Sequence, residues 1–167
     1  MTLFGAQLVQ QKGNETDYRF DVVGTNSQVF HSGDPVTISS GKLIVAAATS
    51  NILGVVAKTA TMAADNDSVA KICPAVVPAE NDTIFLMGTN SNLTGNATDV
   101  GTYYMLTGTT GAVLVDVTSG AQTSTGRVVE IVKVDPFNEG GSGAGSGLRT
   151  VYVRFVKTYD EDIAITP

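Results

Sequence analysis

The residues of this chain that could do chemistry are few, and they lie in short clusters. His31, Ser32 and Asp34 are the residue types of a hydrolase triad. Triad residues usually come from separated segments, and no Gly-x-Ser-x-Gly nucleophile elbow accompanies this cluster. We therefore interpret His31 as a turn residue without a catalytic role, and we expect that the chain is not an enzyme.

Metal ligands are also scarce. The chain has one histidine and one cysteine, Cys73, whereas zinc sites need several such ligands. Asp65-Asn66-Asp67 resembles the opening of a calcium loop, but Ala70 stands where that loop requires glycine. We interpret this segment as an Asx-type turn, with a weak calcium site as the alternative. Cys73 is expected to be a buried residue of a strand, and we expect neither a metal nor a cofactor.

A glycine-rich segment at residues 140–147 invites a phosphate-binding interpretation. Its glycines do not fall at the first, third and sixth places of a dinucleotide fingerprint, and Gly41-Lys42 is followed by Leu43 rather than by Ser or Thr. We expect a flexible connection between two strands, because a run of glycines offers no side chains to pack.

Charge and hydropathy exclude two classes of partner. The chain has a net charge of −6 and no run of Lys or Arg, whereas nucleic-acid binding requires a basic face. No apolar stretch approaches the ~20 residues that span a bilayer, and residues 1–5 lack the features of a signal peptide. We therefore expect that the protein binds neither nucleic acid nor a membrane, and that it is synthesised in the cytoplasm.

The surface predicted from the composition is poor in charge. Charged residues make up 16% of the chain, well below the ~25% that is usual in soluble proteins. Thr, Ser, Asn and Gly must therefore cover much of the surface. Such a surface repels its neighbours weakly, which favours close packing against other subunits.

The elements that must position these residues are predicted to be strands. Three apolar runs at residues 35–38, 42–46 and 52–57 are separated by turn-forming Ser, Gly and Asn. Their Val and Ile side chains pack well on a pleated surface, so we expect an antiparallel meander, the start of a small barrel. Pro35 cannot donate to a strand ladder, which places it at the first position of its strand or on an edge.

Other short apolar runs complete this prediction. We expect strands at residues 18–23, 28–31, 83–87, 103–106, 112–117, 127–134 and 151–156. The runs at 69–73 and 75–77 are separated by Pro74, so we expect them to form at most a kinked or edge strand. The run at 83–87 is predicted to be buried on both faces, and the segment from 103 to 117 to be a hairpin. No sustained 3.6-residue period occurs, so the fold class is all-β, without a helix longer than two turns.

The chain divides into three regions. Residues 1–24 are predicted to form an N-terminal arm and first strand region, and residues 25–158 a β-barrel domain with the Gly/Ser-rich loop at 138–147. Residues 159–167 form an acidic tail. The arm carries the apolar residues Leu3, Phe4, Leu8 and Val9 ahead of a polar loop, so it could leave the domain. The alternative is that this segment is an ordinary first strand of the sheet.

Several segments resemble the tailed-bacteriophage capsid decoration (cement) proteins. They are Gly33-Asp34-Pro35-Val36, Ile52-Leu53-Gly54-Val55-Val56-Ala57, Asp99-Val100-Gly101-Thr102-Tyr103-Tyr104-Met105-Leu106 and Gly126-Arg127-Val128-Val129-Glu130-Ile131. The resemblance covers roughly residues 28 to 157 and rests on turns and strands. It implies a small β-barrel or β-tulip without catalytic residues, assembled commonly as trimers on the outside of the mature head. The loop after Asn138 departs from the family's pattern.

The resemblance implies a structural virion protein that stabilises the outer capsid surface by bridging major capsid protein subunits. Its expected partners are the major capsid protein and further copies of this chain in a homotrimer. Weak surface charge and apolar strands with exposed edges also favour the trimer. Partner contacts are expected at Leu3, Phe4, Leu8 and Val9.

Two alternative functions remain open. One is a ligand-binding barrel such as a carbohydrate module, which would need solvent-facing aromatic residues. Tyr103 and Tyr104 are the only adjacent aromatic pair, and the chain contains no Trp. The other is a different structural virion component, such as a tail or fibre module.

Overall fold

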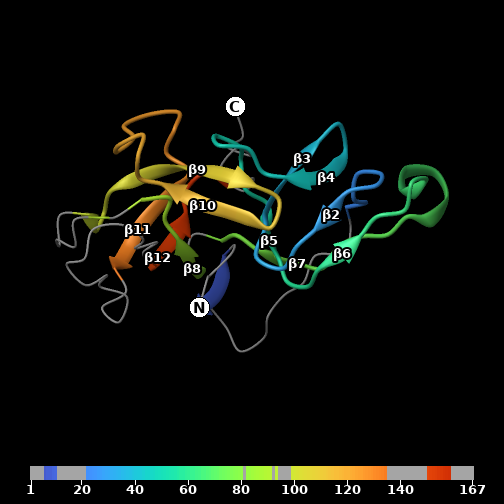
Figure 1. Ribbon diagram of the computed structural model, residues 1–167, viewed down its shortest axis with the longest axis horizontal. Helices are drawn as coiled ribbons and strands as arrows, with labels where there is room; N and C mark the ends of the chain where they lie inside the picture. Colours follow the sequence, from blue (N-terminus) through green and yellow to red (C-terminus); the bar gives the residue numbers. More distant parts are fainter. Residues whose placement is uncertain are drawn as a thin grey trace, which may run out of the picture.

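The described part of the chain folds almost entirely as β-strands. The computed structural model describes residues 6–10, 22–80, 82–91, 93, 99–134 and 150–158 (Figure 1). Its strands are β1 (Gln7–Gln10), β2 (Val29–Phe30), β3 (Pro35–Ser39), β4 (Lys42–Val45), β5 (Gly54–Val56), β6 (Ala60–Thr61), β7 (Val76–Pro78), β8 (Ile84–Gly88), β9 (Tyr103–Thr109), β10 (Ala112–Asp116), β11 (Val129–Val134) and β12 (Thr150–Phe155). One π-type helical turn, η1 (Asn66–Ala70), stands among them. The all-β prediction is confirmed. No helix within these ranges is long and apolar enough to cross a bilayer.

The larger sheet is antiparallel and curls into a barrel-like shape, which Figure 1 shows on the left. Its strand order is β1-β8-β12-β11-β9-β10. Just after β8, Thr89 forms a bridge with Val115 of β10, and the N–H of Asn90 donates to the carbonyl of Val115 at 3.0 Å. The last strand of the sheet is thereby joined to the chain leaving β8, which closes one end of the barrel. The predicted hairpin formed by β9 and β10 is confirmed.

A cluster of side-chain hydrogen bonds reinforces this closure. The amide of Asn90 donates to Asp116 Oδ1 at 2.7 Å, and the hydroxyl of Ser119 donates to Asp116 Oδ2 at 2.6 Å. Partial burial raises the pKa of Asp116, but the hydrogen bonds from Ser119 and Asn90 outweigh it. The pKa of this carboxyl is therefore below its ordinary value of 3.8.

Acid should weaken the closure. Because the pKa of Asp116 is lower in the folded state, its stabilising contribution is present above the ordinary value and is lost as the pH falls through the folded pKa. We expect Asp116→Asn to lower the Tm at neutral pH and to reduce the further fall in Tm between about pH 5 and pH 2. Circular dichroism melting measures both values. Asp65→Asn, at an exposed carboxylate, should keep the wild-type fall, and an unchanged fall in the Asp116 variant would contradict the assignment.

The main core lies inside the curled sheet. Phe85 and Met87 of β8 are completely buried, whereas Leu86 between them and Ile84 before them are only half-buried. Burial on both faces of this strand was therefore a wrong expectation, because only one face of the sheet covers the core. Phe85 packs against Phe155 of β12 with ring centroids 5.3 Å apart. Burying an aromatic side chain of this size contributes about 1.5–3 kcal/mol.

The smaller sheet has the order β4-β3-β5-β7, and β2 pairs with β6 beside it. Ser40 and Gly41 both have positive φ, 49° and 74°, which matches the tight turns that suit the twist of a hairpin. The predicted meander is wrong in one respect, because β5 pairs with β3 and not with β4. The segment between β4 and β5 takes the chain across to the other side of β3, where the N–H of Leu53 donates to Val36 at 2.8 Å. Pro35 begins β3, as predicted.

The predicted strand at residues 69–73 is wrong. Asn66 is completely buried, its amide donates to the carbonyls of Gly24 and Ile72, and its Oδ1 accepts the N–H of Ile72. These bonds use the backbone groups that strand pairing would need. Lys71 adopts a left-handed conformation with φ 53°, which turns the chain. Cys73 is consequently half-buried outside any strand rather than buried within one.

One buried carboxylate joins the two sheets. Asp34 has no exposed surface, and it lies in the turn between β2 and β3. Its Oδ2 accepts the N–H of His31 at 2.9 Å, and its Oδ1 accepts the N–H of Gly111 at 2.7 Å. Gly111 belongs to the β9–β10 turn, so Asp34 holds that hairpin against the smaller sheet. A second junction is the bridge between Ile52 and Thr158.

The N-terminal segment is partly integrated into the domain. Residues 7–10 form β1, which pairs with β8, and the N–H of Ala6 donates to the carbonyl of Gly33 at 2.6 Å. The segment expected to be an arm therefore contributes an edge strand to the larger sheet, as the alternative interpretation proposed. Leu3, Phe4, the loop at 138–147, the tail at 159–167 and most of the predicted strand at 18–23 lie outside the described residues.

Candidate functional site

His31, Ser32 and Asp34 do not assemble as a triad. The side chain of His31 is 47% exposed, and its Nδ1 lies 3.8 Å from Asp34 Oδ2, an oxygen that already accepts a backbone N–H. The hydroxyl of Ser32 donates to the carbonyl of Ala57 at 3.1 Å. These contacts give the three residues structural roles in a turn, in keeping with the interpretation of His31 as a turn residue.

Asp65-Asn66-Asp67 does not form a calcium loop. Asp67 Oδ2 lies 2.6 Å from Lys42 Nζ, and its Oδ1 accepts a hydrogen bond from the amide of Asn26 at 2.8 Å. The hydrogen bond from Lys42 holds the pKa of Asp67 below its ordinary value. Over the described residues, no three His, Cys, Asp or Glu side chains gather as metal ligands. A lysine therefore balances the carboxylate that a calcium ion would have needed.

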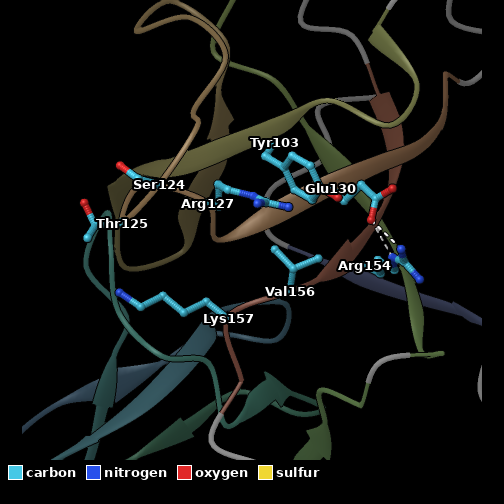
Figure 2. A pocket seen from close by; sticks show the side chains of 8 residues that line it. All are labelled: Tyr103, Ser124, Thr125, Arg127, Glu130, Arg154, Val156 and Lys157. Carbon is cyan, nitrogen blue, oxygen red and sulfur yellow. Dashed lines mark hydrogen bonds and ion pairs between the residues drawn. The ribbon is translucent and has the colours of Figure 1, made fainter. Parts of the chain in front are cut away.

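A depression of about 650 Å³ opens on the outer face of the barrel (Figure 2). The pairing register places Glu130 of β11 directly opposite Tyr103 of β9 on one side and Arg154 of β12 on the other. The adjacent residue on each strand is buried in the core, as the low exposures of Tyr104, Val129 and Phe155 show. The row formed by Tyr103, Glu130 and Arg154 consequently faces outward. The other lining residues are Ser124, Thr125, Arg127, Val156 and Lys157.

Each charged side chain of this depression has a fixed neighbour. The guanidinium of Arg127 lies over the ring of Tyr103, 3.6 Å from its centroid. Arg154 Nη2 is 2.6 Å from Glu130 Oε2, and Lys157 Nζ donates to the carbonyl of Thr49 at 2.5 Å. Three cations and one carboxylate give the lining a formal charge of +2, in a chain whose net charge is −6. Guanidinium and ammonium groups hydrogen-bond carboxylates and phosphates, so this arrangement suits the binding of an anionic group.

The two adjacent tyrosines have different environments. Tyr104 is only 5% exposed, and its burial, followed by the nearby Asp99 carboxylate, raises the pKa of its phenol. Tyr103 is half-buried at the depression, where Arg127 covers one face of its ring. A carbohydrate module stacks sugar rings on exposed aromatic faces. The pair therefore offers at most one ring face to a sugar.

This depression was not predicted from the sequence. Its residues come from β9, β11, β12 and the segments next to them, which are far apart along the chain. Alternation over residues 127–134 placed Glu130 on one face with Val128 and Val132. Val128 is instead completely buried, and the pairing of β11 with β12 shifts register between Ile131 and Lys133. The facing partners depend on cross-strand register, and no local pattern specifies that register.

The expected partner-contact residues fall in two groups. Leu8 and Val9 belong to β1, the edge strand that pairs with β8. Leu3 and Phe4 precede the described residues. Partner contacts by all four side chains stay a prediction.

Comparisons with protein-family models, with curated proteins and with solved structures found no match to this chain. Function must therefore be inferred from the fold and contacts described above.

Proposed function

We propose that this protein is a structural virion protein that decorates the outer surface of a phage capsid. In this role it stabilises the capsid by bridging major capsid protein subunits, and it acts as a homotrimer without catalytic activity. The proposal starts from the resemblance to decoration proteins, whose implied small β-barrel agrees with the barrel-like fold of this chain. In this role the protein is synthesised in the host cytoplasm before it joins the virion.

The observation that carries the proposal is the position of β1. This strand is the outermost member of the larger sheet, and within the described ranges no strand pairs with its other side. The backbone N–H and C=O groups along such an edge are a template for a strand of another chain. Adding a strand to an exposed edge is a common mode of protein recognition, and it would connect the barrel to a capsid subunit.

Exposed apolar side chains supply a second kind of contact surface. Val69 is 73% exposed and Ile72 is 39% exposed on the loop between β6 and β7, at the right-hand end of Figure 1. Val100, before β9, is 47% exposed. Apolar groups at these positions favour burial against neighbouring subunits, and the charge-poor surface opposes such packing only weakly.

The proposal is tested by adding the purified protein to expanded heads of the phage that encodes it, prepared without decoration protein. We expect saturable co-sedimentation, and a mass of three times 17.3 kDa for the bound or free oligomer. Heads that are already decorated should bind none, which controls for adsorption. A chain that stays monomeric and does not bind undecorated heads would refute the proposal.

Deletion of residues 2–11 tests the role of β1. Because β1 lies at the edge, its removal leaves the β8-β12-β11-β9-β10 order uninterrupted. We expect the variant to melt cooperatively at a reduced temperature and to lose head binding. If the melting transition disappears, β1 is required for folding; if the folded variant binds heads like the full chain, β1 is not the contact.

A tail or fibre module would share the strand edges and apolar loops used above. Immunogold labelling of intact virions separates the locations, because a decoration protein labels the head. Label confined to the tail would replace the capsid role with this second structural role.

A further inference from the structure

The outer-face depression lined by Arg127, Arg154 and Lys157 has no part in the capsid argument above. Three of the chain's ten Lys and Arg residues line it, although the chain as a whole is acidic. We infer that this depression binds a carboxylate-bearing segment of a partner polypeptide. The partner is defined here by its chemistry alone, so the site does not depend on a capsid role.

Arg127 is oriented for such a ligand. Its contact with Tyr103 uses the flat face of the guanidinium, with the ring centroid 3.6 Å away. The N–H donors lie in the guanidinium plane, so stacking leaves them available, and their fork matches the two oxygens of a carboxylate. Among the described acidic residues, none forms an ion pair with Arg127. The ring also restricts the side chain before the ligand arrives.

Lys157 supplies a second, spatially fixed cation. One of its three N–H donors is used by the carbonyl of Thr49, which holds the ammonium at the edge of the depression. Figure 2 shows its side chain extended below Arg127 toward Thr125. Ser124 and Thr125 line the same end of the depression. Two cationic and two hydroxyl-bearing side chains thus line one end of the depression.

The opposite end carries a different charge pattern. Glu130, whose side chain is 14% exposed, receives both Nε and Nη2 of Arg154 on its Oε2, each at 2.6 Å. This pair is internally balanced, and its carboxylate repels a second carboxylate placed beside it. The anionic group of a ligand should therefore lie toward Arg127 and Lys157.

Size and charge favour a peptide over other anions. A depression of about 650 Å³ is of the size that holds a ligand of several groups, larger than a single ion requires. A nucleic acid would bring one charge per phosphate toward a molecule of net charge −6, while the lining offers a formal charge of only +2. An acidic peptide brings few charges, and its backbone amides can pair with the hydroxyls of Ser124 and Thr125.

The experiment measures binding of a fluorescent peptide of alternating glutamate and glycine to the full chain, by anisotropy. We expect saturable binding that weakens as salt is raised, since exposed charges are screened. Arg127→Gln and Lys157→Gln should each weaken binding by about tenfold or more, the loss expected for a charge-assisted hydrogen bond. Lys58→Gln makes the same charge change at an exposed lysine outside the depression and should alter affinity by less than about twofold.

Four outcomes would overturn the site. The first is that the matched glutamine–glycine peptide binds as tightly as the acidic peptide. The second is that the affinity is unchanged in both Arg127→Gln and Lys157→Gln. The third is that an oligothymidylate or inorganic phosphate binds more tightly than the acidic peptide. The fourth is peptide binding that requires removal of residues 159–167, which would identify the chain's own carboxylates as the occupant. Melting curves of each variant check that the barrel is folded. Because Arg127 and Lys157 are substituted independently, the test stays valid if one of the two variants does not fold.

Discussion

Replacing Asp34 by alanine is expected to lower the free energy of unfolding by about 2–5 kcal/mol. The carboxylate is completely buried and accepts the N–H groups of His31 and Gly111. Without it, both donors, which are part-buried, lose their acceptor, and a donor left without a partner away from water costs about 1–3 kcal/mol. The two sheets would also lose the contact that holds the β9–β10 turn in place. Since domains are stable by only about 5–15 kcal/mol, this single change removes a large share.

Urea unfolding followed by circular dichroism measures the loss. Asp34→Asn should also destabilise the protein, because its amide nitrogen would face one of the two N–H donors. Asp65→Ala is the matched control, since Asp65 is exposed, and it should change stability by less than about 0.5 kcal/mol. A wild-type unfolding midpoint for Asp34→Ala would show that the carboxylate does not hold the sheets together.

Replacing Asn66 by alanine is expected to cost about 2–4 kcal/mol. The buried amide donates to Gly24 at 2.7 Å and to Ile72 at 3.0 Å, and it accepts the N–H of Ile72 at 2.7 Å. The carbonyl of Gly24 and the N–H of Ile72 would lose this partner, whereas the carbonyl of Ile72 would still accept the N–H of Gly24 at 3.1 Å. The loss should be concentrated in the loop between β6 and β7, because the amide connects Ile72 of that loop with Gly24. Asp67 of the same loop would keep its contacts with Lys42 and Asn26.

Amide hydrogen exchange locates this effect. The N–H of Ile72 and its neighbours in the loop should exchange much faster in Asn66→Ala, while the N–H groups of β8 and β12 keep their relative protection. Ser68→Ala, which removes an exposed hydroxyl from the same turn, should leave exchange unchanged. Uniformly faster exchange over the whole chain would instead mean that Asn66 supports the entire fold.

Local patterns predicted the fold well where pairing is local. Ser40 and Gly41 favoured a tight turn, and the β3–β4 hairpin has it. The β9–β10 hairpin was predicted in the same way. The position of β5 was not, since nothing in residues 46–51 indicates on which side of β3 the chain returns. Residues 69–73 read as a strand because Val69 and Ile72 are β-branched, yet the hydrogen bonds of one buried amide outweigh that preference.

The candidate site was less accessible to prediction for a related reason. The outward direction of Glu130 did not follow from the predicted alternation, which grouped this residue with the completely buried Val128. That Tyr103 and Arg154 lie beside it follows from the register of β9 and β12 against β11, which is set by the whole sheet. The buried state of Asp34 also depends on a distant partner, the N–H of Gly111.

The strand order has a consequence for how the chain folds during synthesis. β1 can pair only after β8 has been synthesised. The other neighbour of β8 is β12, which is synthesised much later. Pairings between such distant segments form slowly, because closing a long loop costs conformational entropy before any stabilising contact is made. The β3–β4 and β9–β10 hairpins can form as soon as they emerge from the ribosome. Until β12 is synthesised, β8 and β11 lack the strand that lies between them in the folded sheet, and their unpaired edges and apolar faces favour aggregation of the unfinished chain.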